Sequence, residues 1–161
     1  SAFANWEVNR LHHKKPSRMK AFLIAASLIA LPGLVFAHGG AMGPTKVRMD
    51  AMVSTKDSLS RLQKATTGTE LDRAAAEQSL AELRTFAAAL PTLFEEKHLP
   101  VMSEALPSIW ENAEQFDTEI RFFAEQVDLA QAQLDDNPSQ VLRTVAAGCA
   151  SCHDKFREKK Q

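Results

Sequence analysis

The chain has 161 residues, 45% of them hydrophobic, with 19 basic and 20 acidic side chains and a formal net charge of −1. Without the leader described below, residues 38–161 hold 14 basic and 19 acidic residues, a net charge of −5. This negative charge argues against nucleic acid and anionic membranes as partners and favours a basic docking partner. The length of that segment fits one ordinary domain.

Residues 1–37 are predicted to be a leader that is removed from the working protein. The first 18 are polar and basic, and Met19 then opens a segment whose apolar run, residues 21–36, is 16 residues long and broken by a Pro-Gly pair. That run is shorter than the ~20 residues needed to span a membrane. Small or β-branched residues stand at the −3 and −1 positions before His38, which predicts a signal peptide over Met19–Ala37 and export to the periplasm. No stable membrane insertion is expected after cleavage.

From residue 45 onward the apolar residues recur at helical spacing, which predicts four helices and no strand. The first helix, over residues 45–66, ends before Gly68 and carries on one stripe Met49, Met52, Leu59 and Leu62. The second is predicted to be capped by Thr69 and to end before a Pro-punctuated connection over residues 91–106. Its apolar stripe is Ala76, Leu80, Leu83, Phe86 and Leu90.

The third helix is predicted to start at Pro107 and has the most regular period in the chain. Its apolar residues are spaced 4-3-4-3-4-3-4, as a bundle seam requires: Ile109, Ala113, Phe116, Ile120, Phe123, Val127, Ala130 and Leu134. Asn137 and Pro138 open the fourth helix, whose stripe is Val141, Val145, Cys149, Cys152 and Phe156. The predicted fold is therefore all-α, an antiparallel up-down-up-down four-helix bundle.

The fourth helix carries the sequence Cys149-Ala150-Ser151-Cys152-His153, and C-x-x-C-H is the attachment signature of a c-type haem. The spacing puts both sulfurs and the imidazole on one face of a helix. Cys149 and Cys152 can then form thioether bonds to one porphyrin, while His153 reaches the iron as proximal ligand. We therefore expect one covalent haem c between the helices.

Three other interpretations of the two cysteines are weaker. A thioredoxin-like dithiol would need a βαβ context. A zinc site would need further ligands that a chain with two cysteines lacks. A disulfide between helix positions i and i+3 has poor geometry, because these side chains are not aimed at each other.

With C-x-x-C-H on its last helix, the chain resembles the class II c-type cytochromes, the cytochrome c′ family, rather than mitochondrial-type cytochrome c. The resemblance covers residues 45–160 and is carried by four stretches, residues 48–52, 90–94, 107–117 and 148–157. The second and third stretches look more like the low-spin branch of the family, in which a Met from the first helix fills the sixth iron position. High-spin members leave that position open and are associated with the binding of small gases.

The resemblance places the sixth ligand at Met52, four residues after Arg48 on the first helix. Met49, one turn earlier on the same face, and an open position are the alternatives, and a Met on an apolar stripe is often only core filler. The other candidates are Met42, Met102, His38 and His98. Of these, His98 is expected to be a solvent-exposed loop residue.

The resemblance also implies roles for two cations. It places Arg48 near a haem propionate and Arg157 beside the proximal His153, since guanidinium groups are the favoured partners of buried carboxylates. The alternative for each is an ordinary solvated surface charge.

Together these features predict a periplasmic electron-transfer protein rather than an enzyme, with His153 and Met52 as the axial ligands of an iron that cycles between Fe(III) and Fe(II). The first alternative is a five-coordinate haem protein that binds NO or CO. The second is a haem-bearing stress or scaffold protein without a fixed redox partner. Partners are expected to be redox proteins, and the resemblance implies that homodimers can form through the first two helices.

Overall fold

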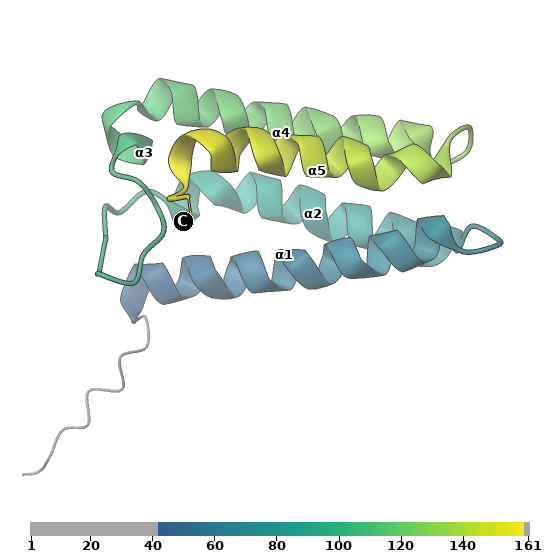
Figure 1. The fold of residues 1–161 in the computed structure, drawn as a ribbon, viewed down its shortest axis with the longest axis horizontal. Coiled ribbons are helices and arrows are strands. Elements are labelled where there is room, and N and C mark those ends of the chain that lie inside the picture. Colours follow the sequence, from purple (N-terminus) through teal and green to yellow (C-terminus); the bar gives the residue numbers. More distant parts are fainter. Residues whose placement is uncertain (1–41, 160–161) are drawn as a thin grey trace, which may run out of the picture. The chain divides into compact units, whose positions relative to one another are not determined.

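The computed structural model describes residues 42–159, and the predicted leader lies outside these residues. The described part contains five α-helices and no strand: α1 (Gly43–Thr67), α2 (Arg73–Leu93), α3 (Ser108–Glu111), α4 (Ala113–Gln133) and α5 (Pro138–Phe156). The four long helices lie antiparallel to their neighbours in an up-down-up-down bundle (Figure 1). The all-α four-helix prediction is confirmed. Between residues 42 and 159, no helix is both long enough and apolar enough to cross a membrane.

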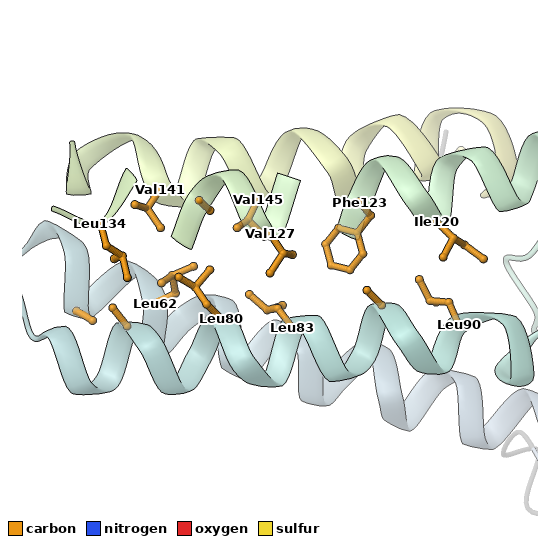
Figure 2. Close-up of a cluster of buried hydrophobic side chains, with 14 of the residues drawn as sticks. Leu62, Leu80, Leu83, Leu90, Ile120, Phe123, Val127, Leu134, Val141 and Val145 are labelled. Carbon is orange, nitrogen blue, oxygen red and sulfur yellow. The ribbon is translucent and has the colours of Figure 1, made fainter. Parts of the chain in front are cut away.

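The helices pack around the bundle in the order α1, α2, α4, α5, and the ring is closed by the less extensive contact between α1 and α5. The hydrophobic core lies between the four long helices, whose labelled side chains point toward one another in Figure 2. Its fully buried side chains lie away from the long connection, residues 94–107. The largest fully buried apolar side chains there are Leu62, Leu80, Leu83, Val127, Leu134, Val141 and Val145. The stripes predicted for the second and fourth helices thus face the interior, although Phe86, Cys149 and Cys152 are only half-buried.

The start and the end of α2 differ from the sequence prediction. Asp72, not Thr69, is the N-cap, and its side-chain oxygen accepts a hydrogen bond from Ala75 N at 3.1 Å. Pro91 lies inside the last turn of α2 instead of ending the helix. The turn persists because Phe94 N–H still donates to Leu90 O at 3.1 Å, and the Phe94 ring packs edge-on against an aromatic ring of α4, 5.1 Å between centroids.

The helix predicted to run on from Pro107 is broken at Asn112, whose backbone (φ −126°, ψ 52°) separates α3 from α4. Trp110 Nε1 donates a hydrogen bond to Phe94 O at 2.7 Å, which ties the short α3 to the start of the connection. The break turns Ala113 out to solvent, so the predicted seam is continuous only from Phe116 onward. A tertiary hydrogen bond thus overrides a regular apolar period.

The close approach of α4 and α5 depends on Gly148, directly before Cys149. A Cβ placed on Gly148 would lie 3.0 Å from both Cα and Cδ2 of Phe123 and 3.4 Å from Cβ of Gln126. Phe123 is buried in the core, so its backbone has little room to move. The absence of a side chain at Gly148 therefore sets the distance between the two helices.

We expect Gly148→Ala to destabilise the protein by about 1–3 kcal/mol, because the added methyl overpacks the α4–α5 contact. This loss should appear in urea unfolding followed by helical circular dichroism, although alanine is the better helix former by ~1 kcal/mol. Ala147→Ser, an exposed position in the same turn, should stay within about ±0.5 kcal/mol of the wild type. Equal or greater stability of Gly148→Ala would contradict the overpacking argument.

Candidate functional site

A cavity of about 500 Å³ lies at the end of the bundle that the connection crosses. Side chains from α1, α2, α4, α5 and the connection line it, and most of the lining is apolar. The volume falls within the range of about 300–1,000 Å³ that is typical of small-molecule and cofactor pockets. The cavity occupies the half of the bundle that the densely packed core leaves open, between α1 and α5.

Cys149, Cys152 and His153 all line the α5 side of this cavity. Both cysteines are half-buried and carry free thiols. Burial raises the pKa of Cys149 and, with help from the carboxylate of Glu119, raises the pKa of Cys152 to about 11. The two thiols therefore stay protonated at neutral pH and face an apolar space. The helix places them on one face, as the C-x-x-C spacing predicts.

Burial, with the positive charge of Arg157 as the second cause, lowers the pKa of His153. The imidazole is therefore neutral at neutral pH, which is the form that ligates a metal ion. Within residues 42–159, no group of three or more His, Cys, Asp and Glu side chains is arranged to hold a metal ion. The donor that faces the cavity from α5 is a single imidazole flanked by two thiols.

Three of the candidate sixth ligands line the cavity, namely Met49 and Met52 from α1 and Met102 from the connection. Met52 is half-buried, whereas Met49 and Met102 are 47% and 43% exposed. Met42 is 76% exposed and is not part of the lining, and His38 lies outside the described residues. Among the three thioethers, Met52 is the one that packs against the core.

His98 is not the solvent-exposed loop residue that the sequence suggested. It is half-buried, and Thr45 Oγ1 lies 2.8 Å from its Nδ1 and 3.1 Å from its carbonyl oxygen. Thr45 is itself buried at the start of α1. His98 therefore helps to fasten the connection to α1, and it is not part of the cavity lining.

Arg48 is buried, with 5% of its surface exposed, although an arginine on a helix is usually solvated. Its guanidinium donates hydrogen bonds to the carbonyl oxygens of Leu93 (2.6 Å), His98 (3.0 Å) and Glu96. It also lies 5.0 Å from the ring centroid of Phe94, within cation–π range. Arg48 lines the cavity, but its hydrogen bonds hold the connection against α1. Its predicted contact with a propionate stays a prediction.

Arg157 also lines the cavity, four residues after His153. Its Nε donates to Oε2 of Glu104 in the connection at 2.8 Å. Two backbone hydrogen bonds join the same segments, from Leu106 N to Phe156 O at 3.0 Å and from Glu158 N to Glu104 O at 2.8 Å. The connection is thus fastened to α1 at one point and to the end of α5 at another. The charge of Arg157 helps to lower the pKa of His153, and its expected role beside the haem stays a prediction.

Sequence reasoning missed Glu119 of α4. This carboxylate is 4% exposed, lines the cavity and accepts a hydrogen bond from Ser151 Oγ at 2.6 Å and another from Lys155 Nζ. The signal was present in the sequence, since Glu119 lies three residues after Phe116 and four before Phe123, on the apolar face of its helix. A buried acid at such a position needs a partner that pairs with it or donates hydrogen bonds to it.

Comparison with known proteins agrees with this geometry. A family model described as cytochrome c′ matches residues 44–157. Two curated proteins from Rhodopseudomonas palustris, a cytochrome c-556 and a cytochrome c′, are 32% and 34% identical over 95 and 94 residues, covering 55% and 56% of this chain. The aligned part spans 64% of each of these relatives, just under two thirds of their length. A cytochrome c-556 from Agrobacterium fabrum is 30% identical over 128 residues, or 74% of this chain and 84% of that protein.

Solved structures share the fold. The NMR-validated structural model of oxidized cytochrome c556 from Rhodopseudomonas palustris has a TM-score of 0.62 at 25% identity and covers 73% of this chain and 98% of that chain. A nitric oxide complex of a cytochrome c prime mutant from Alcaligenes xylosoxidans has a TM-score of 0.63 at 24% identity, with 73% and 94% covered. The bundle that carries the cavity is thus similar to those of known cytochromes.

The hydrogen bonds of Arg48 can be tested by substitution. In Arg48→Met, the carbonyl oxygens of Leu93, Glu96 and His98 lose their donor, and a buried acceptor left without a partner costs about 1–3 kcal/mol. We expect a loss of at least ~2 kcal/mol in urea unfolding and faster proteolysis within the connection. Arg61→Met is the control, because Arg61 is 46% exposed in its ion pair with Glu82 and should cost less than ~1 kcal/mol. Equal effects of the two variants would refute the anchoring role.

Proposed function

This chain belongs to the cytochrome c′ family of class II c-type cytochromes, and we propose that Cys149 and Cys152 carry the two thioether bonds of its covalent haem c, with His153 as the proximal ligand. Two observations of the cavity fit that group. Both thiols and the neutral imidazole face one apolar space, and that space has the volume of a cofactor pocket. Haem c supplies an iron that changes between Fe(III) and Fe(II).

Met52 is the proposed sixth ligand. It lies on the α1 side of the cavity, while the proximal His153 lies on the α5 side. Met52 is also better buried than Met49 and Met102, so its thioether is held in place by packing instead of moving in solvent. A thioether donor stabilises the ferrous state and raises the reduction potential.

The function that this site supports best is electron transfer without catalysis. The observation that carries it is that one cavity is lined by Cys149, Cys152 and His153 from α5 and by Met52 from α1. A side-chain ligand on each side would leave no open position for a substrate or a gas. The proposed setting is the periplasm, after removal of residues 1–37, with a redox protein as partner, and homodimers can form as in the family.

Covalent attachment is tested by extraction. The haem of the purified protein should stay with the polypeptide in acid acetone, and the double variant Cys149→Ala, Cys152→Ala should release it, because a thioether survives acid and a coordinate bond does not. Haem that is extractable from the wild type would overturn the attachment proposal.

Removal of the leader is tested by mass spectrometry. The intact mass of the exported wild type should equal one haem plus a chain that begins at His38. A retained leader would overturn the proposed processing.

The sixth ligand is tested with Met52→Leu. Leucine has a similar volume, so packing should change by less than ~1.5 kcal/mol. The iron, however, loses its thioether donor, so we expect a change from low-spin to high-spin absorption, a lower reduction potential and new CO binding by the reduced protein.

Met49→Leu is the matched control, since Met49 lines the same cavity one turn earlier and should change none of the three properties. If Met52→Leu keeps the low-spin spectrum, Met52 is not the ligand. If the wild type is already high-spin and binds CO, the five-coordinate gas-binding function replaces electron transfer.

A further inference from the structure

Glu119 is the one acidic residue among residues 42–159 that is buried. It lies on α4 with Phe116, Ile120 and Phe123, and all four side chains line the cavity. Burying a carboxylate is unfavourable unless it is paired and hydrogen-bonded. Its position beside the cavity therefore needs a reason, and α5 supplies its partners.

Each oxygen of Glu119 accepts one hydrogen bond from α5. Ser151 Oγ donates to Oε2 at 2.6 Å, and Lys155 Nζ donates to Oε1. Burial alone would raise the pKa of Glu119, but the hydrogen bonds from Lys155 and Ser151 outweigh it and bring the pKa below its usual value. The carboxylate is therefore ionised at neutral pH.

The two donors flank the haem-attachment residues. Ser151 lies between Cys149 and Cys152, and Lys155 lies two residues after His153. Glu119 thus fixes to α4 the turn of α5 that carries the thiols and the imidazole. The same carboxylate contributes to the electrostatic potential inside the cavity.

The ion pair with Lys155 does not cancel the potential that Glu119 produces inside the cavity. The side chain of Glu119 is 6% exposed, whereas that of Lys155 is 44% exposed and faces water. Water screens a charge at the surface much more than one in the protein interior. The Glu119–Lys155 pair therefore contributes a net negative potential to the cavity.

We propose that Glu119 is a positioning residue that holds the C-x-x-C-H turn and, as a fixed negative charge in the cavity wall, lowers the reduction potential of the site. This inference rests on the proposed function. In reduction, one electron passes from a reduced redox protein to Fe(III), which becomes Fe(II), and the step needs no proton. Fe(III) carries one more positive charge than Fe(II), so the carboxylate stabilises the oxidised form.

The test is the reduction potential of the holoprotein at pH 8, measured by spectroelectrochemical titration. Glu119→Gln keeps the side-chain volume and an oxygen that can accept the bond from Ser151, but it removes the charge. At a fixed applied potential we expect its ratio of reduced to oxidised protein to rise three- to tenfold, and tenfold corresponds to ~59 mV for one electron. Glu125→Gln, an exposed position on the same helix, should change the ratio less than twofold.

Lys155→Gln gives the opposite charge change at an exposed position. It leaves the carboxylate without its cation, so the ratio of reduced to oxidised protein should fall. If Glu119→Gln does not attach haem, the direction of the Lys155→Gln shift decides the matter: a fall supports the proposal, and no change overturns it. A role in packing alone predicts lower stability of Glu119→Gln with an unchanged potential, which would overturn the proposal, as would an equal shift in Glu125→Gln.

The test of Glu119 does not depend on whether Met52 is the sixth ligand. Glu119→Gln and the wild type both keep Met52, so they are expected to have the same axial ligands. Their reduction potentials can be compared whether the iron is six-coordinate or five-coordinate. A high-spin wild type would therefore refute Met52 as the sixth ligand. The change in reduction potential caused by Glu119→Gln would still test the role of Glu119.

Discussion

The contact between α4 and α5 at Gly148 is the constraint on which the rest of the site depends. Gly148 lies against the backbone and ring of Phe123, which is at once part of the core and part of the cavity wall. Cys149 follows directly, so this contact fixes where the C-x-x-C-H turn faces. The Ser151–Glu119 and Lys155–Glu119 hydrogen bonds continue the same interface toward the end of α5. A larger residue at this one position would move Cys149, Cys152 and His153 together.

The connection, residues 94–107, crosses an apolar cavity, where the carbonyl groups of a loop need hydrogen-bond donors. Arg48 supplies donors to the carbonyls of Glu96 and His98, and to that of Leu93 at the end of α2. Glu158 N–H donates to the carbonyl of Glu104, and Leu106 N–H of the connection donates to Phe156 O. A buried guanidinium is unfavourable unless such partners surround it, and stacking on Phe94 replaces part of its lost hydration. The closure of the cavity thus rests on a cation that the sequence shows only as one more charge on a helix.

The sequence could predict the features that depend on the helical spacing of neighbouring residues. The stripes of α2 and α5 and the placement of the C-x-x-C-H residues on an inward face follow from helical spacing alone, and the structure has them there. The break at Asn112 and the buried state of His98 depend on partners 16 and 53 residues away, Phe94 for Trp110 and Thr45 for His98. No local pattern contains that information. Glu119 is an intermediate case. The sequence shows that it lies on the apolar face of its helix, but not that Ser151 and Lys155 donate hydrogen bonds to it.

The two buried charges, Arg48 and Glu119, face one cavity but are satisfied in different ways, and this difference matters for the iron. The hydrogen-bond partners of Arg48 are carbonyl groups, and the carboxylate of Glu96 acts on the guanidinium through its charge. Glu119 has a cationic partner that lies mostly toward water. Both charges are therefore felt inside the cavity, where the low dielectric makes them stronger than surface ion pairs such as Arg84–Asp128. A cofactor that carries anionic propionates on one edge and a metal of variable charge at its centre meets a wall charge of each sign. A buried charge costs folding free energy unless it has partners, and here each has its own: carbonyl groups hold Arg48, and Ser151 and Lys155 hold Glu119.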